Sequence, residues 1–374
     1  MTTNISPLAP PPLRVLVVDD SALYRKIVRT ILESSPGVQV VGTASNGRTA
    51  MELIREEKPD LVTLDLEMPQ LDGLGVLRAL RDESMCPGVI MLSAHTGEGA
   101  NATMQALRLG AFDFVLKPAV GTLEQNTARL QSQLIPKVLQ FASSRPTVGR
   151  AVGQTPTPAA STVRPPTPES PPSRRHLADH PLAAIGIGVS TGGPVALSHL
   201  VPSLPGDLPA PVFIVQHMPP VFTKSLADDL DRHSAITVME AEDGMVPAPG
   251  CVYLAKGGFQ MKVENCGDGV QVRVTSDPPE KSCRPSVDYL FRSLAHVYGG
   301  RALGLIMTGM GDDGALGSQL MKRAGARIVA QEASTCVVYG MPRVIVEKQL
   351  ADSVLPLDQL AGAIVHACAE RVNS

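Results

Sequence analysis

Five short and almost wholly apolar runs, separated by amphipathic stretches, limit the folds open to the first third of the chain. The runs are RVLVVDD, VQVVGTA, DLVTLDL, GVIMLSA and FDFVLKP. A strand that is apolar on both faces must be covered on both sides, whereas a half-exposed strand alternates apolar and polar residues. The intervening stretches have helical spacing, at Ala22–Glu33, Arg48–Glu57, Leu74–Arg81 and Glu98–Leu109. We therefore predict a parallel sheet with helices on both faces.

A segment poor in apolar residues divides the 374-residue chain. Residues 142–176 contain no Leu, Ile, Met, Phe or Tyr, and residues 154–172 hold seven prolines in nineteen positions. Such a segment has little to bury and favours extended conformations, so a linker is predicted rather than a Pro-rich ligand for another domain. The predicted division is an amino tail at 1–12, a first domain at 13–131, a helix end and linker at 132–178, and a second domain at 179–374.

The alternation of apolar runs and helices resumes after the linker. AAIGIGVS, PVFIVQH, ALGLIMTG and RIVAQEA predict buried strands, with helices at Ser286–Val297 and Ala315–Ala324. Residues 237–275 differ, because TVMEAE, CVYLAKGG, FQMKVEN and VQVRVTS are short, turn-separated and partly alternating. They predict an antiparallel hairpin region attached to the second sheet. The predicted fold class is α/β, with two doubly wound parallel-sheet domains.

Composition excludes several classes of protein. A net charge of -3, 3% aromatic residues and no Trp argue against a nucleic-acid-binding surface. No apolar run approaches the roughly 18–20 residues that a membrane span needs, and no signal peptide is evident, so a cytoplasmic protein is expected. The six cysteines form no C-x-x-C pair, which excludes a zinc knuckle and a thioredoxin-type motif.

Polar side chains follow four of the first five runs at their carboxyl ends. Asp19 and Asp20 end the first run, Asp65 ends the third, and Ser93 and Lys117 follow the last two. The carboxyl ends of parallel strands share one sheet edge, where ligands bind. Clustered carboxylates favour a hard cation such as Mg²⁺, and one of them could then attack a phosphoryl donor. A single Asp at a strand end is more often a cap, but five such groups together indicate a phosphoryl site.

The sequences VLVVDDSALYRK, TLDLEMPQLDGL, MLSA and DFVLKP resemble the receiver domain of two-component response regulators, over about residues 14–131. The resemblance implies a flavodoxin-like fold and phosphorylation of Asp65 by a histidine kinase. It also implies an Mg²⁺ site, phosphoryl-binding side chains and an aromatic switch residue. The implied Mg²⁺ ligands are Asp19, Asp20, Asp65 and the backbone carbonyl of Glu67, the phosphoryl-binding residues are Ser93 and Lys117, and the switch residue is Phe114.

The second half carries a G-x-S-x-G pattern at residues 188–192, directly after an apolar run. This spacing presents Ser190 on a sharp turn between a strand and a helix. The glycines also fit a dinucleotide-binding loop, but that alternative expects an acidic residue after the next strand, which instead ends in Gln-His. His217 lies where a base could reach Ser190, and Asp312 or Asp313 follows a third strand. A Ser-His-Asp hydrolytic site is therefore predicted.

The sequences GVSTGGP, IVQHMP, CRPSVDYLFRSLA and IMTGMGDDGA resemble the catalytic domain of chemotaxis-type protein-glutamate methylesterases, the CheB family, over about residues 180–372. The resemblance implies that Ser190, His217 and Asp313 form the triad. Asp313 is preferred to Asp312 because it matches the aspartate of the family motif.

The same resemblance extends to supporting positions. It implies that the backbone of Met310, with Thr191, stabilises an oxyanion. Pro285, Ser286 and Asp288 also match a family motif, but no chemical step follows from them, and their pattern equally describes the start of a helix.

Together the two resemblances imply a phosphorylation-regulated hydrolase of chemosensory adaptation. It would remove methyl groups from glutamate γ-methyl esters of methyl-accepting chemoreceptors, releasing methanol, and deamidate receptor glutamines, with no metal needed for the ester reaction. The unphosphorylated receiver would cover the triad. A non-catalytic adaptor and a DNA-binding regulator are the rival classes. The presence of all three triad residues argues against the adaptor, and the lack of a basic recognition helix argues against DNA binding.

Overall fold

A five-stranded parallel sheet forms the first α/β unit, in the order β2-β1-β3-β4-β5. The computed structural model describes residues 11–94, 96–144, 181–267 and 269–369, so the predicted linker and most of the predicted amino tail lie outside the described residues. All five predicted strands are confirmed. Their bounds are β1 Leu13–Val18, β2 Val38–Ala44, β3 Leu61–Asp65, β4 Gly88–Ser93 and β5 Asp113–Leu116.

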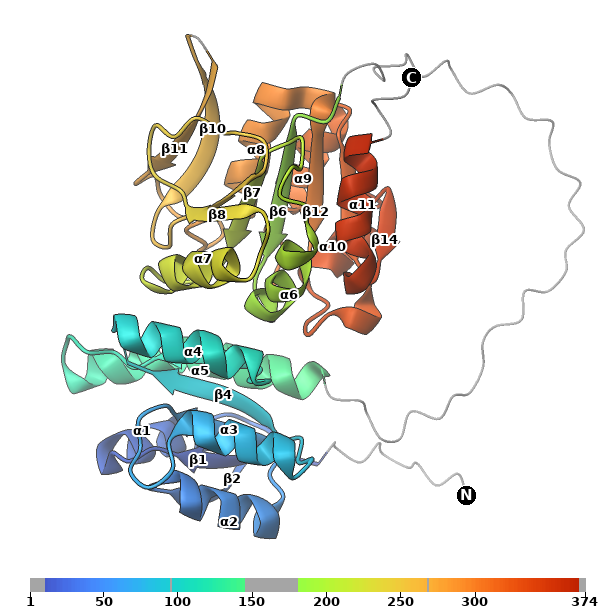
Figure 1. Cartoon of the computed structure of the whole chain (residues 1–374). Helices are drawn as coiled ribbons and strands as arrows, with labels where there is room; N and C mark the ends of the chain where they lie inside the picture. Colours follow the sequence, from blue (N-terminus) through green and yellow to red (C-terminus); the bar gives the residue numbers. More distant parts are fainter. Residues whose placement is uncertain (1–10, 95, 145–180, 268, 370–374) are drawn as a thin grey trace, which may run out of the picture.

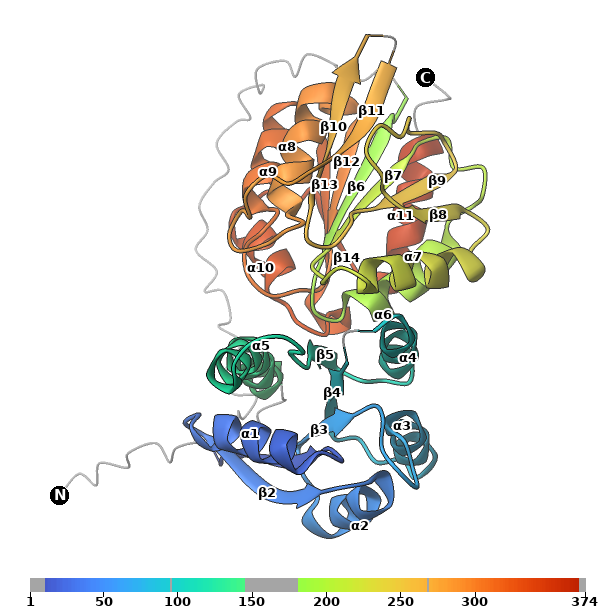
Figure 2. The same cartoon turned by 90° about the vertical axis from the view of Figure 1, so that its left-hand side faces the viewer.

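Helices cover both faces of this sheet, as predicted (Figures 1 and 2). Helices α1 and α5 lie on one face, and α2, α3 and α4 lie on the other. The side chain that precedes each of the first four helices accepts a hydrogen bond from a backbone N–H of the first turn, which explains where these helices begin. The helices are α1 Ala22–Glu33, α2 Gly47–Glu57, α3 Gly73–Asp82, α4 Gly97–Arg108 and α5 Leu123–Ser144.

Helix α5 extends beyond residue 131, the predicted end of the first domain. It continues to Ser144, and Leu134 and Val138 in its second half are fully buried against the core that β1 and α1 share. The part of α5 beyond residue 131 therefore packs as part of the first unit.

A seven-stranded parallel sheet forms the second unit, in the order β14-β13-β12-β6-β7-β9-β8. Three of its central strands, β12, β6 and β7, are immediate neighbours. The strands are β6 Ala184–Val189, β7 Val212–Gln216, β8 Thr237–Glu240, β9 Cys251–Leu254, β12 Ala302–Ile306, β13 Arg327–Gln331 and β14 Ser353–Leu355.

Helices α8, α9 and α10 cover one face of the second sheet, and α6, α7 and α11 cover the other (Figure 2). None of the helices in the described ranges combines the length and the apolar character that a bilayer crossing requires. The helices are α6 Gly193–Leu200, α7 Phe222–Arg232, α8 Val287–Tyr298, α9 Ala315–Arg323, α10 Met341–Glu347 and α11 Leu357–Ala369, with short 3₁₀ turns at Val201–Ser203, Gly299–Arg301 and Ala333–Thr335.

The hairpin region predicted for residues 237–275 is only half correct. Strands β10 (Gln260–Cys266) and β11 (Gly269–Thr275) form the expected antiparallel pair, which packs on α8. Strands β8 and β9 instead pair in parallel with each other, and β9 pairs in parallel with β7, so both belong to the main sheet. Strand β8 is the edge strand, and β9 lies between it and β7.

The two units pack against each other through α4 of the first and through α6 and α7 of the second (Figure 1). Buried apolar residues on the α2–α4 face of the first unit and on the α6, α7 and α11 face of the second form one continuous cluster. The boundary between the units is therefore closed by apolar packing as well as by polar contacts.

We expect Leu134→Ala to destabilise the first unit, because it opens a cavity in a fully packed core. A buried Leu→Ala change costs about 2–5 kcal/mol. The measurement is chemical denaturation of the full chain, following the transition of the first unit. Leu139→Ala is the matched control, because Leu139 lies in the same helix and is 45% exposed. Equal stability of the two variants would contradict the packing of this half of α5.

Candidate functional site

Lys117 meets two of the predicted Mg²⁺ ligands at the carboxyl edge of the first sheet. Lys117 Nζ lies 2.7 Å from Asp19 Oδ2 and 2.7 Å from Asp65 Oδ2. Asp19 and Asp65 are buried, whereas Asp20 is exposed at the mouth of the site. Glu67 lies two residues after Asp65, in the turn that follows β3.

The electrostatics of this edge suit a small cation. Burial raises the pKa of Asp65 to about 6, although Lys117 opposes the increase. Burial likewise raises the pKa of Asp19. Carboxylate oxygens of Asp19, Asp20 and Asp65 all lie within 4.8 Å of one another, so three hard donors converge while a single lysine partly neutralises them. An oxygen-rich cluster with this excess of negative charge fits Mg²⁺.

Ser93 ends β4, and Phe114 lies on the neighbouring strand β5, which is the last strand of the same sheet. The Ser93 hydroxyl is buried and accepts a hydrogen bond of 2.8 Å from Thr103 Oγ1 in α4. Phe114 on β5 is buried, and its ring stacks on Phe222 of α7, with ring centroids 4.6 Å apart and planes at 21°. The predicted switch residue therefore contacts the second unit directly. Nothing in the sequence pointed to Thr103 or Phe222.

Ser190, His217 and an aspartate follow three adjacent strands of the second sheet. Ser190 comes directly after β6, His217 directly after β7, and Asp313 lies in the turn between β12 and α9. Ser190 and His217 line the same cavity. Gly309 lies against the serine, and a Cβ atom on it would approach Ser190 Cβ to 2.7 Å, so only glycine allows the two turns to come this close.

The His217 ring is oriented by Asp313. Its Nε2 lies 2.8 Å from Asp313 Oδ2, and since a carboxylate only accepts, Nε2 carries a proton. The other ring nitrogen, Nδ1, lies 3.9 Å from the sulfur of Cys283. Burial alone would lower the pKa of His217, but the hydrogen bond to Asp313 and the contact with Cys283 raise it to about 9.

Asp313 is held by the amino end of α8. Its carboxylate accepts hydrogen bonds from the Ser286 hydroxyl at 2.9 Å and from the backbone N–H groups of Val287 and Asp288 at 2.7 and 3.0 Å. Burial would raise the pKa of Asp313, but the hydrogen bond to His217 and these N–H groups lower it. Asp312 instead points outward and pairs with Lys281.

The contact between Asp313 and the start of α8 gives a role to the motif of Pro285, Ser286 and Asp288, for which the sequence alone predicted no chemical step. Ser286 caps α8, as its pattern predicts, and its hydroxyl also reaches Asp313. Asp288 is buried and accepts a hydrogen bond from the N–H of Gly317 in α9. The motif therefore ties α8 to the turn that carries Asp313.

The two residues predicted to stabilise an oxyanion lie beside the serine and in the turn after β12. Thr191 is buried, and its carbonyl accepts a hydrogen bond of 2.9 Å from Thr308 Oγ1. Met310 is 50% exposed. Gly192 immediately precedes α6 at φ +76°, and a Cβ there would come within 2.5 Å of Val337 Cβ.

The cavity of about 240 Å³ that contains Ser190 and His217 is walled by both units. Phe114, Asp113 and Lys137 of the first unit line it. Beside it, Arg108 of α4 forms an ion pair with Asp229 of α7 and donates a hydrogen bond of 3.1 Å to His233 Nε2. The first unit thus covers the cleft of the second.

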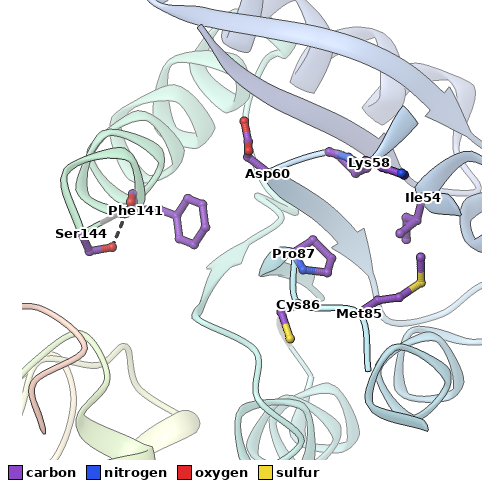
Figure 3. A pocket seen from close by; sticks show the side chains of 9 residues that line it. Ile54, Lys58, Asp60, Met85, Cys86, Pro87, Phe141 and Ser144 are labelled. Carbon is purple, nitrogen blue, oxygen red and sulfur yellow. Dashed lines mark hydrogen bonds between the residues drawn. The ribbon is translucent and has the colours of Figure 1, made fainter. Parts of the chain in front are cut away.

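A separate pocket, drawn in Figure 3, lies at the opposite edge of the first sheet. It has a volume of about 530 Å³ and is lined by residues that precede β3 and β4 and by the end of α5, among them Asp60, Pro87 and Phe141. It contains none of the predicted site residues, so it takes no part in either site.

Known proteins resemble both units and the whole chain. The CheB methylesterase family matches residues 185–364, and the response regulator receiver domain matches residues 15–127. A protein-glutamate methylesterase/protein-glutamine glutaminase of Desulfotalea psychrophila is 46% identical, covering 95% of this chain and 98% of that protein. The protein of the same name from Symbiobacterium thermophilum is 45% identical, covering 96% and 98%.

Solved structures match the units separately. The crystal structure of the Thermotoga maritima CheB methylesterase catalytic domain is 40% identical, with a TM-score of 0.49, and covers 49% of this chain and 97% of that one. The response regulator domain of Thermotoga maritima CheB is also 40% identical, with a TM-score of 0.33, and covers 36% and 99%.

The fold and its two strand-end sites define a receiver domain joined to a methylesterase-type domain that is also built on a parallel sheet. With relatives above 40% identity over nearly its full length, the chain belongs to the family of protein-glutamate methylesterases/protein-glutamine glutaminases that carry a response regulator receiver domain.

Proposed function

We propose that this chain hydrolyses glutamate γ-methyl esters of chemoreceptors to glutamate and methanol, and receptor glutamines to glutamate and ammonia. The observation that carries the proposal is the convergence of Ser190, His217 and Asp313 on the ends of three adjacent strands, with His217 Nε2 held 2.8 Å from Asp313. The family to which the chain belongs supports the choice of substrate.

The proposed reaction is acyl transfer through Ser190. The hydroxyl oxygen attacks the γ-carbonyl carbon while Nδ1 of His217 takes its proton, and the leaving methanol or ammonia receives that proton. Water then attacks the acyl-serine and loses a proton to His217, which passes it to the Ser190 oxygen as the bond to the glutamate breaks. Asp313 stabilises the charged ring, and the backbone of Met310, with Thr191, stabilises the oxyanion. None of these steps requires a metal.

We propose that the receiver at residues 13–131 is phosphorylated on Asp65 by a histidine kinase of the chemosensory pathway. Asp19, Asp20, Asp65 and the carbonyl of Glu67 would hold Mg²⁺, which neutralises the phosphoryl oxygens when bound. Ser93 and Lys117 would bind the phosphoryl group, with Phe114 as the switch residue. Residues 132–178, which comprise the end of α5 and the Pro-rich linker, would precede a catalytic domain at 179–374. We propose a cytoplasmic location, where the chemoreceptor signalling helices and the histidine kinase would be accessible.

We propose that phosphorylation exposes the triad by loosening the contact between the two domains. Because the cavity of about 240 Å³ is walled by both domains, a receptor helix cannot reach Ser190 in this arrangement. The stack of Phe114 on Phe222 supports this coupling, since it links the strand that precedes Lys117 to the catalytic domain. The closed and open forms are then populations in equilibrium, which phosphorylation shifts.

Ser190→Ala is expected to abolish most methanol release from methylated receptor membranes, because the attacking oxygen is gone. His217→Ala should be similarly severe, and the double variant should lose little more, since triad members act as a unit. Ser203→Ala is the matched control, because that hydroxyl is exposed and bonds only within its own turn. Near-normal release by a folded Ser190→Ala protein would end the triad proposal.

Asp65→Asn is expected to remove labelling of the chain by a small phosphodonor in the presence of Mg²⁺, since the amide cannot form an acyl phosphate. Asp20→Asn should instead raise the Mg²⁺ concentration that labelling needs. Asp82→Asn, which changes an exposed carboxylate at the end of α3, serves as the control. Labelling of Asp65→Asn at the parent level would show that another residue is the acceptor.

Arg108→Ala is expected to raise methanol release in the absence of a phosphodonor, because it removes the ion pair between α4 and Asp229. A partly exposed pair contributes up to about 1 kcal/mol, so the open population should rise up to about fivefold. The phosphorylated variant should match the phosphorylated parent. Arg78→Ala on α3 is the control, since Arg78 is exposed and does not line the cavity. An unchanged or lower basal rate would contradict the role of this contact.

A further inference from the structure

The loop between β11 and α8 touches the catalytic site at three points. Lys281 Nζ pairs with Asp288 Oδ2 at 3.0 Å and with Asp312 Oδ2 at 3.1 Å. Ser286 bonds Asp313. Between these two, Cys283 places its sulfur 3.9 Å from His217 Nδ1. The contacts of Lys281 and Ser286 anchor the loop before and after Cys283, so the cysteine is held against the His217 ring.

The backbone before the cysteine shows that this placement is enforced. Lys281 and Ser282 both have positive φ, 48° and 65°, a conformation that side-chain-bearing residues adopt only when their surroundings demand it. The ion pairs of the Lys281 side chain provide that demand. The sulfur also lies 3.6 Å from the Lys281 carbonyl oxygen, which closes the turn around it.

The nitrogen that Cys283 touches is the one that has to act in the reaction. Since Asp313 Oδ2 engages Nε2, only Nδ1 of His217 remains to take the proton of Ser190. The sulfur of Cys283 therefore lies next to Nδ1, the ring nitrogen that would accept the proton of Ser190. Cys336 makes a useful contrast, because its sulfur lies against the backbone carbonyl of Gln331 and burial raises the pKa of that thiol.

We propose that Cys283 is a positioning residue that controls how tightly His217 holds a proton on Nδ1, and hence the pH at which the esterase becomes active. This inference rests on the proposed function. A protonated Nδ1 donates to the polarisable sulfur, so the contact stabilises the charged ring, as Asp313 does on the other edge. Removing the sulfur should let the ring lose its proton at lower pH.

The surroundings of the ring support this direction. Burial opposes the charged ring, yet the pKa of His217 stands at about 9 with Asp313 and Cys283 beside it. The other ionisable groups that line the cavity are Asp113 and Lys137 of the receiver, and they pair with each other at 2.5 Å. Their charges largely offset one another, so the two catalytic-domain neighbours dominate.

The test compares full-length parent, Cys283→Ala and Cys283→Ser, each with Mg²⁺ and acetyl phosphate. The pH dependence of kcat/KM for methanol release reports the ionisation of the base in the free enzyme. We expect the acid limb of Cys283→Ala to move to lower pH by about half a pH unit or more, which is about a threefold change in proton affinity. Cys283→Ser should move it less, because a hydroxyl retains part of the contact, and KM should stay the same in both variants.

A second readout does not depend on turnover. Titration of the His217 ring by NMR, with its signals assigned by their loss in His217→Gln, should show the same order of pH midpoints. If Ser190→Ala kept its activity, the proposed function would fall, but the ring titration would still test Cys283. If Cys283→Ala does not fold, Cys283→Ser carries the test.

Cys266→Ala is the matched control, since Cys266 lies at the end of β10 and does not line the catalytic cavity. Unmoved midpoints in folded Cys283 variants would overturn the proposal. An equal shift in Cys266→Ala would also overturn it, because the effect would then not arise from contact with the ring.

Discussion

The carboxylate of Asp313 is the interaction on which the second site depends. It is buried, and a buried charge is tolerated only where hydrogen bonds replace its lost hydration. The amino end of α8 provides them, through the Ser286 hydroxyl and two backbone N–H groups. The positive end of the helix dipole favours the same charge. One carboxylate thereby joins the turn after β12, the start of α8 and the ring of His217.

The same edge of a parallel sheet serves both domains but is used differently. In the receiver, Lys117 lies between Asp19 and Asp65 and holds two buried carboxylates that would otherwise repel each other. In the catalytic domain the charges are balanced between an imidazole and a single carboxylate. The first arrangement gathers carboxylates around a lysine, and the second orients an imidazole ring. The difference follows from which polar residues end the strands, because the two sheets share their architecture.

The contact between the domains lies close to both sites. Phe114 lies three residues before Lys117, and its ring stacks on Phe222 in the catalytic domain. Apolar packing of this kind is not directional, so it holds the domains together without specifying a single arrangement. Polar contacts such as the ion pair of Arg108 with Asp229 favour one orientation of the two domains.

Local patterns determined much of this protein, because the period of apolar residues reports burial and the polar residues that end buried strands must lie at one sheet edge. The five strands and four helices predicted before the linker, and the strand-end positions of Asp65, Ser190 and His217, follow from such patterns. Strands β8 and β9 were wrongly predicted to be hairpin strands, since partial alternation does not show whether neighbouring strands pair in parallel or antiparallel. The family resemblance favoured Asp313 over Asp312 and a receiver that covers the triad, and residue spacing alone left both open. Only the tertiary structure showed that Ser286 holds Asp313 and that Cys283 lies at Nδ1 of His217. Each of these depends on contacts between segments far apart in the chain, and residue spacing alone carries no information about such contacts.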